Sequence, residues 1–323
     1  MTSSPELAEA LKSGDRRALA KAITLIESTR PADRPLAHEL LRTLAEPSVS
    51  SFRIGVTGVP GAGKSTLIDG LGCAAIAAGH RVAVLAVDPT SRQSGGSVLG
   101  DKTRMSRLAA QEAAFVRPSP TLGVLGGTAA RTREVISLCE AAGYDMIFVE
   151  TVGVGQSEEQ VASLVDCVLL VLLAGAGDEI SAMKRGVLEA ADVIAFNKAD
   201  GERIASVQND AAALRASLTI GQRVPPVQVV SAIEGVGVAD LWATLAAQRA
   251  GTGGASAFHE RRARQRISWF ESALEEELFA EFARRPGAEA ERRAAEASVE
   301  EGRASPIEAA RRLVHEWLRG ARS

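Results

Sequence analysis

The sequence predicts an α/β protein built on a mainly parallel sheet that helices cover on both faces. From Phe52 onward, short apolar runs alternate with helical patterns of ordinary length. The runs are apolar at nearly every position, as expected for strands that are buried on both faces of a parallel sheet. Right-handed crossovers then bring the loops after the strands together at one edge. The predicted strands are Ile54–Thr57, Val82–Val87, Met146–Val149, Cys167–Leu173, Val193–Phe196 and Val227–Val230.

Helical segments flank the predicted sheet on both sides in the sequence. The chain divides into an N-terminal helical extension (1–48), a main α/β domain (49–249), a linker (250–257) and a C-terminal helical arm (258–323). Glycine and alanine dominate the linker, which favours a flexible coil. The arm is too short to bury a core of its own, so its apolar stripe must pack on the main domain or on a second copy. The stripe residues recur at helical spacing: Ile267, Phe270, Leu274 and Leu278.

The composition is that of a soluble, globular protein from a reducing compartment. Hydrophobic residues make up 46% of the chain and charged residues 24%, and both values are ordinary for this class. The net charge of −3 gives no sign of a nucleic-acid-binding protein. The cysteines are widely spaced without a C-x-x-C pair, and the longest apolar run, Cys167–Ala174, is far too short to span a bilayer. We therefore expect a cytoplasmic protein with no nucleic-acid partner and no membrane contact.

The segment Gly58–Thr66 is the pattern on which the predicted site depends most. It has the spacing of a phosphate-binding P-loop and lies between a predicted strand and a predicted helix. Glycines let backbone N–H groups turn towards phosphate oxygens, and the helix N-terminus adds partial positive charge. We expect Lys64 to reach the β- and γ-phosphates of a nucleotide and the Ser65 hydroxyl to ligate Mg²⁺. The predicted phosphate-binding residues are Gly58, Pro60, Gly61, Ala62, Gly63, Lys64, Ser65 and Thr66.

A second motif, Asn197-Lys198-Ala199-Asp200, follows a predicted strand and fits the guanine-recognition pattern Asn-Lys-x-Asp. The Asp200 carboxylate can accept hydrogen bonds from guanine N1–H and N2–H₂, two donors that adenine lacks there. We expect the Asn197 amide to contact the purine edge and the Lys198 stem to pack across the ring. Ser231 and Ala232, which follow the last strand, match the loop whose backbone N–H groups meet guanine O6 in GTPases. The nucleotide is therefore expected to be GTP or GDP.

The strand Met146–Val149 ends in Glu150-Thr151-Val152-Gly153. Ordinary GTPases have Asp-x-x-Gly here, with the acid near Mg²⁺ and the glycine N–H on the γ-phosphate, so Glu150 and Gly153 are the corresponding candidates. Val154 stands where many GTPases place the glutamine that orients the attacking water. The sequence therefore predicts slow hydrolysis unless a partner completes the site.

Two further carboxylates are candidates for the metal shell or for positioning water. Asp88 ends the second predicted strand, and Asp101 lies in the glycine-rich, polar segment 92–104. A segment of this composition is typical of a switch that orders around γ-phosphate and Mg²⁺. The alternative interpretation of both residues is as turn and cap residues.

These motifs together resemble those of the MeaB/ArgK family of GTPases. The resemblance runs from the N-terminal helices to about Trp242 and continues more loosely into the arm. The matching segments are Val56–Ser65, Ala86–Ser91, Gly95–Met105, Glu150–Glu158, Gly175–Glu179 and Asn197–Asp200.

The resemblance implies a metallochaperone-type GTPase of the signal-recognition/MinD-like P-loop class, with GTP/GDP and Mg²⁺ as ligands. Members of this family bind an adenosylcobalamin-dependent acyl-CoA mutase, typically methylmalonyl-CoA mutase. They gate loading of the intact cofactor and release of the damaged form. The resemblance also implies a homodimer in which the C-terminal arm takes part, in agreement with an arm that lacks its own core.

The resemblance assigns roles to individual residues as well. Asp88, Asp101 and Glu150 match the Mg²⁺ and catalytic carboxylates of the family, and Lys184 matches a basic residue of an additional switch loop that responds to the mutase. The sequence departs from the family at Ala174, where proline is common. Its P-loop has no second lysine that could act across a dimer, because Val59 and Pro60 occupy that part of the loop.

Two other functions are open to a P-loop sequence of this kind. One is a protein kinase, an older description of ArgK-like sequences, although Asn197 and Asp200 favour guanine over adenine. The other is a nickel-type metal-insertion GTPase, a class that usually carries His-rich or Cys/His clusters. The four histidines of this chain have no metal-ligand spacing.

Overall fold

The computed structural model describes most of the chain. The described ranges are 4–28, 30–44, 51–87, 104–119, 127–151, 161–175, 185–218, 224–251 and 254–320. The chain divides into two compact units, Met1–Gln265 and Arg266–Ser323. Across the described residues, no helix is both long enough and apolar enough to traverse a bilayer.

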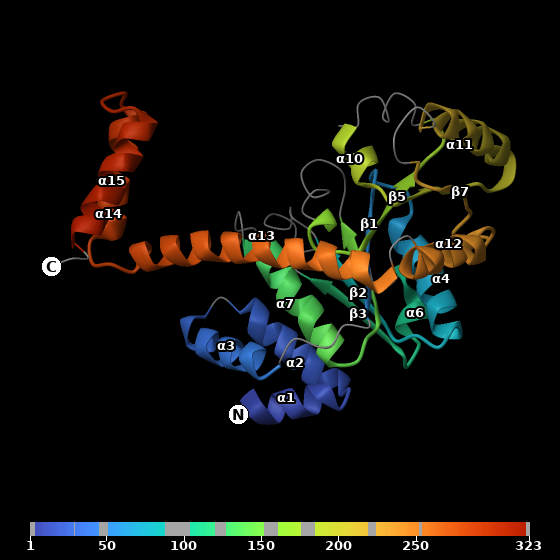
Figure 1. Cartoon of the computed structure of the whole chain (residues 1–323), viewed down its shortest axis with the longest axis horizontal. Coiled ribbons are helices and arrows are strands. Elements are labelled where there is room, and N and C mark those ends of the chain that lie inside the picture. Colours follow the sequence, from blue (N-terminus) through green and yellow to red (C-terminus); the bar gives the residue numbers. More distant parts are fainter. Residues whose placement is uncertain are drawn as a thin grey trace. The chain divides into compact units, whose positions relative to one another are not determined.

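A parallel sheet forms the centre of the first unit (Figure 1). Its described strands lie in the order β3-β2-β4-β1-β5-β6-β7, and every neighbouring pair is parallel. This arrangement confirms the predicted fold class. The strands are β1 Phe52–Gly58, β2 Val82–Val87, β3 Ala114–Ser119, β4 Met146–Thr151, β5 Cys167–Leu172, β6 Val193–Phe196 and β7 Val227–Val229.

Strand β3 is the one described strand that the apolar pattern did not predict. It lies at the edge of the sheet and pairs only with β2. Arg117 and Pro118 interrupt its apolar sequence. Proline lacks a backbone N–H and is tolerated at a sheet edge because that position needs no donor on its outer side.

Helices cover both faces of the sheet, as the nearly continuous apolar strands predict. Leu169 and Val171 of β5 belong to one apolar cluster, together with residues of α4 (Lys64–Ala77), α6 (Ser106–Ala109) and α12 (Val238–Ala250). Leu170 and Leu172 point to the opposite face and pack in a second cluster with α11 (Ile204–Leu218). Helices α7 (Gly127–Ala141) and α10 (Arg185–Ala190) and the short 3₁₀ helix η2 (Gly201–Arg203) complete this α/β region.

The N-terminal extension forms three helices, α1 (Ser4–Lys12), α2 (Arg16–Glu27) and α3 (Arg34–Thr43), with a 3₁₀ turn η1 (Pro31–Asp33) before the third. Asp15 is the N-cap of α2. Its carboxylate accepts hydrogen bonds from the N–H groups of Arg17 and Ala18, at 2.7 and 3.3 Å. Helix α2 packs against α7, and Glu27 pairs with Arg117 of β3 at 2.5 Å. The extension therefore packs on the α/β domain.

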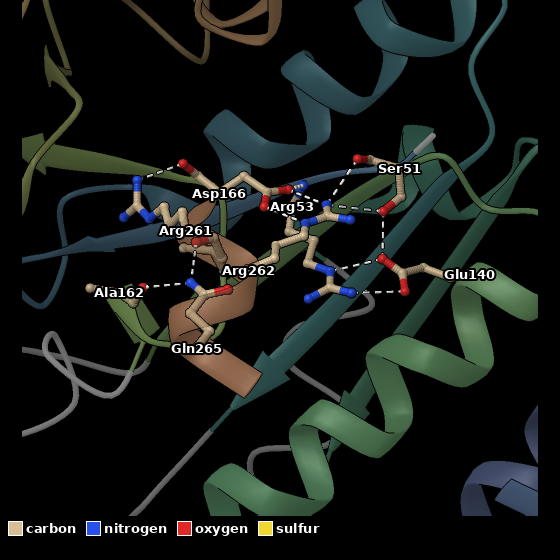
Figure 2. Close-up of polar contacts among 9 residues, drawn as sticks. Ser51, Arg53, Glu140, Ala162, Asp166, Arg261, Arg262 and Gln265 are labelled. Carbon is tan, nitrogen blue, oxygen red and sulfur yellow. Dashed lines mark hydrogen bonds and ion pairs between the residues drawn. The ribbon is translucent and has the colours of Figure 1, made fainter. Parts of the chain in front are cut away.

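The C-terminal part begins with α13 (Gly254–Ala283), which starts inside the predicted linker 250–257. Its first turns belong to the first unit, where the Phe258 ring packs edge-on against Phe52 with centroids 5.6 Å apart. Arg262 forms a buried ion pair with Asp166, before β5 (Figure 2). The compact α/β unit therefore extends past the predicted start of the arm at 258, because these turns supply core and charge partners.

The second unit contains the rest of α13 and two further helices, α14 (Ala288–Glu300) and α15 (Pro306–Gly320), which pack together. The Trp317 ring is buried and stacks on Phe282 with centroids 5.1 Å apart, and its Nε1–H donates to Glu291 at 2.8 Å. The predicted stripe on α13 is different, because its side chains are mostly exposed. Their exposed fractions are 62% for Ile267, 66% for Phe270, 48% for Leu274 and 52% for Leu278.

Candidate nucleotide-binding site

The predicted P-loop connects β1, at the centre of the sheet, to the first residue of α4. Gly58, Gly61 and Gly63 have φ angles of 141°, 77° and 82°, which side chains rarely adopt. At two of these positions, neighbouring atoms also leave no room for a side chain. A Cβ on Gly58 would lie 2.0 Å from the Val171 oxygen, and a Cβ on Gly63 would lie 2.6 Å from Asn197 Nδ2. The loop backbone therefore needs glycine here and leads into a helix N-terminus suited to anions.

Lys64 is buried at the start of α4, and its ammonium lies within its own loop. Nζ donates to the carbonyl oxygens of Gly58 and Val59 at 2.9 and 3.1 Å. Burial lowers the pKa of Lys64, and the nearby Glu150 carboxylate opposes that shift. Because phosphate oxygens are stronger acceptors than neutral carbonyls, an incoming nucleotide offers this ammonium a better partner.

Ser65 and Glu150 meet beside the loop, as their predicted shared role requires. The Ser65 hydroxyl donates to Glu150 Oε1 at 2.7 Å, and both side chains are buried. Mg²⁺ prefers such oxygen ligands and, on a nucleotide, commonly takes one or two from the protein and the rest from phosphates and water. This donor set fits the ion. No group of three or more His, Cys, Asp or Glu side chains suited to a metal occurs in the described ranges.

Two threonines next to this site in the chain connect β4 to β1. Thr151, at the end of β4, donates its hydroxyl to Thr57 Oγ1 of β1 at 3.1 Å, and both are buried. This contact has no signal in the sequence, because the two residues are far apart in the chain. It fixes the end of β4 next to the strand that enters the P-loop. The predicted residues Asp88, Asp101, Gly153 and Lys184 lie outside the described residues.

Asn197 connects three loops of the site. Its Nδ2 donates to the Ala62 oxygen in the P-loop at 2.7 Å, and its Oδ1 accepts from the Ala232 N–H at 3.0 Å. The side chain is 2% exposed. The sequence predicted a contact between this amide and the purine edge, whereas both of its polar atoms bond to backbone. One Nδ2 hydrogen is left for a base, so the main effect of Asn197 here is to hold the loops together.

The loop after β7 differs from its predicted arrangement. The Ser231 N–H donates to the Val236 oxygen at 2.9 Å, and the Ala232 N–H donates to Asn197. Both N–H groups that were expected to meet guanine O6 are therefore engaged within the protein. These bonds join Ser231 to the turn at 231–236 and Ala232 to Asn197.

One carboxylate oxygen of Asp200 is free to accept a hydrogen bond from a ligand. Its Oδ2 pairs with Arg203 Nη2, while its Oδ1 is buried and has no hydrogen-bond partner in the described part of the chain. Lys198, two residues before Asp200, has φ 62°, the one positive value among described non-glycine residues. Strained backbone of this kind persists mainly at functional sites. A buried, unpaired carboxylate oxygen fits a ligand that brings N–H donors, as guanine does and adenine does not.

An Asp200→Asn substitution tests this assignment. The amide replaces an acceptor with a donor, so we expect GDP affinity to fall about ten- to hundredfold and xanthosine diphosphate, which carries an oxygen at position 2, to bind better. Calorimetric titration of both nucleotides measures the change, and Asp240→Asn on the exposed surface of α12 is the matched control. Equal affinity of the native protein for ATP and GTP would refute the guanine assignment.

A parallel sheet whose β1 leads through a glycine loop to α4, with Asn-Lys-x-Asp at the end of β6, defines a P-loop GTPase. Residues 19–286 match the family described as "Methylmalonyl Co-A mutase-associated GTPase MeaB". The chain belongs to this family of GTPases and, as a member, binds guanine nucleotide and hydrolyses GTP.

Individual relatives agree with this assignment. A probable GTPase of Mycobacterium tuberculosis is 51% identical over 268 residues, which cover 81% of this chain and 80% of the relative. The mitochondrial methylmalonic aciduria type A homolog of Mus musculus is 40% identical over 315 residues, or 93% of this chain and 76% of that protein. The solved structure of a "LAO/AO transport system kinase" is 34% identical, with a TM-score of 0.74, and covers 97% of this chain and 96% of that one.

Proposed function

We propose that this GTPase is a chaperone for an adenosylcobalamin-dependent acyl-CoA mutase, methylmalonyl-CoA mutase or a close relative. GTP hydrolysis would gate loading of the intact cofactor and release of the damaged form. The observation that carries this proposal is the match of residues 19–286 to a family named for its association with that mutase. The name of the mouse relative, which refers to methylmalonic aciduria, points to the same metabolism. The proposal places the protein in the cytoplasm, as its composition predicts.

The proposed hydrolytic site uses this chain's own groups in distinct roles. Lys64 and the N–H groups of Gly58–Thr66 hold the phosphates, and Asp200 selects guanine. Mg²⁺ would be held through Ser65 and Glu150, with Asp88 and Asp101 as further carboxylates, and would offset charge on the β- and γ-phosphates. Because Val154 replaces the usual water-orienting side chain, hydrolysis is slow until the mutase acts through the loop that contains Lys184.

The second part of the proposal is a homodimer that buries the stripe on α13. Ile267 and Phe270 are 62% and 66% exposed, although large apolar side chains aligned on one helix face normally have a partner. A second copy presents the same stripe, and two such helices can pack face to face with twofold symmetry. The dimer would therefore form through residues 258–323, the predicted arm.

Co-elution tests the chaperone proposal. The chain and a purified adenosylcobalamin-dependent methylmalonyl-CoA mutase are mixed and passed over a size-exclusion column with GDP and with a non-hydrolysable GTP analogue. We expect a complex whose stability differs between the two nucleotides, because a partner that senses nucleotide must bind the two states unequally. Separate elution under both conditions, at concentrations well above micromolar, would contradict the proposal.

The solved structure that is 34% identical to this chain is called a kinase, and that name favours a second candidate function, transfer of phosphate to a protein. The two functions differ in where the γ-phosphoryl group goes. With γ-labelled GTP and the mutase, hydrolysis releases all of the label as inorganic phosphate. Label on either protein, stable to denaturation, would instead support the kinase.

A further inference from the structure

Strand β1 pairs further along β5 than along β4. Its pairing with β5 runs to Gly58, opposite Val171, whereas its pairing with β4 ends at Val56, opposite Glu150. The last residue of β4, Thr151, pairs with β2 but lies beyond the paired register with β1. The β1–β4 pairing therefore ends where the P-loop begins and where the candidate metal ligand of β4 lies.

Two threonine hydroxyls continue the contact between β1 and β4 beyond this point. Thr151 Oγ1 donates to Thr57 Oγ1 at 3.1 Å, and the Val56 carbonyl oxygen is a second acceptor at 3.4 Å. Both threonine side chains are fully buried. A buried hydroxyl needs a hydrogen-bond partner, and here each hydroxyl provides one for the other. The last residue of β4 is thus joined to the residue that precedes the P-loop.

The threonine pair and the Ser65–Glu150 pair lie on opposite faces of the sheet. Successive side chains of a strand alternate between faces. The residues two and four positions before Glu150 pack with α4, so Glu150 follows on that face and accepts the Ser65 hydroxyl at 2.7 Å. Thr57 and Thr151 are the alternate residues of their strands. The end of β4 is therefore held by a side-chain hydrogen bond on each face.

Only one of these two bonds uses atoms that a metal ion would need. Ser65 donates its hydroxyl hydrogen to Glu150, and oxygens of the same two side chains are the candidate ligands of Mg²⁺. Ligation through both oxygens would replace the hydrogen bond between them. The bond between Thr57 and Thr151 uses neither oxygen, so it can hold β4 to β1 in both states.

We propose that Thr57 and Thr151 are positioning residues for the Mg²⁺-dependent binding of GTP. Their bond limits the movement of Glu150 relative to the P-loop, so the oxygens of Ser65 and Glu150 stay close enough to share one ion. Groups that orient metal ligands raise metal affinity, because less freedom is lost when the ion binds. The inference rests on the proposed magnesium site at Ser65 and Glu150, and not on the mutase.

Replacing both threonines by valine tests the pair in the full chain without mutase. Valine is similar in shape, and exchanging both partners of a buried hydrogen bond for apolar groups is nearly neutral for stability. For Thr57→Val/Thr151→Val we expect the gain in affinity that Mg²⁺ gives a non-hydrolysable GTP analogue to fall about three- to tenfold. The affinity in EDTA should be unchanged, because Lys64 and Asp200 are intact. Calorimetric titration in Mg²⁺ and in EDTA gives both constants.

A second double variant separates positioning from packing. Thr57→Ser/Thr151→Ser keeps both hydroxyls but removes two buried methyl groups, so we expect a lower thermal midpoint with a nearly native effect of Mg²⁺. The control is Thr43→Val, which removes a hydroxyl bond to the Glu39 oxygen, 2.9 Å long, within α3. It should leave the effect of Mg²⁺ unchanged. The Mg²⁺ concentration for half-maximal GTP hydrolysis should rise only in the double valine variant.

The titrations are made well below the lowest thermal midpoint of the variants. A native-like effect of Mg²⁺ in the double valine variant would overturn the proposal. So would an equal loss of affinity in EDTA, or a double serine variant as impaired as the double valine one, since each would show a purely structural role. A native protein whose affinity does not respond to Mg²⁺ would instead refute the magnesium site, and this inference with it.

Discussion

A chain that ends at Ala257 is expected to be severely destabilised, whereas a chain that ends at Gln265 folds and binds GDP. The shorter chain loses Arg262, the guanidinium partner of an Asp166 carboxylate that is buried in the full chain. Removing one partner of a buried ion pair costs about 3–5 kcal/mol, a large fraction of the stability of most domains. It also loses Phe258, which packs on the core. Thermal unfolding should show a midpoint lower by roughly 10 °C or more.

Single substitutions measure the contribution of the Arg262–Asp166 ion pair apart from the other contacts that the truncation removes. Arg262→Ala should reproduce much of the destabilisation, while Arg264→Ala, on the exposed side of the same helix, should not. Light scattering on the chain that ends at Gln265 tests the dimer, because this chain lacks the whole apolar stripe and should be a monomer. Equal midpoints for the two truncated chains would contradict the assignment of residues 258–265 to the α/β unit.

The second large effect is expected for Lys64→Ala. The variant removes the only side-chain ammonium of the loop, so the developing charge on the transferred phosphoryl group loses a direct partner. We expect kcat for GTP hydrolysis to fall about 10²- to 10³-fold, as with other donors aimed at transition-state charge. The fold should persist, because alanine is favourable at the start of α4. Phosphate release and thermal unfolding, measured on the same sample, give both quantities.

Lys12→Ala is the matched control, since that side chain is on the exposed surface of α1 and pairs only with Glu9 among the described contacts. It should leave both quantities unchanged. Normal turnover by Lys64→Ala would mean that the loop Gly58–Thr66 does not hold the nucleotide in the proposed way.

The sheet could be predicted largely from the sequence, because each central strand is apolar at almost every position. Val82–Val87 and Val193–Phe196 were predicted with the bounds that the structure shows. Strand β3 was not predicted, because its sequence is not continuously apolar. An edge strand is partly exposed, so Arg117 and Pro118 are tolerated there and the apolar signal disappears.

The site was predictable where its chemistry lies within a short run of residues. The P-loop and Asn197–Asp200 are recognised by local spacing, and the structure places both at the ends of strands. Contacts between distant segments gave no such signal. Asn197 meets Ala62, and Thr57 meets Thr151, only after the sheet has formed. The same reason explains why the N–H groups of Ser231 and Ala232 were assigned to the base although they bond within the protein.

The C-terminal boundary shows a similar limit of local patterns. Glycine and alanine near 250–257 indicated a linker, yet α13 begins at Gly254. What decides the extent of the α/β unit is a set of long-range polar contacts. Arg262 and Gln265 look like ordinary helix-surface residues in the sequence, and only the fold brings them to Asp166 and Val165.

Phosphate release from GTP, measured with and without a purified adenosylcobalamin-dependent methylmalonyl-CoA mutase, tests the central proposal most directly. A cation placed on the phosphates can raise phosphoryl transfer by roughly 10³–10⁵ in the most effective cases. We expect a smaller gain, because this site would report nucleotide state rather than turn over quickly. The rate should rise at least severalfold and saturate with mutase, and a Lys184→Ala protein should lose most of the rise. A rate that stays unchanged at saturating mutase would contradict the proposal.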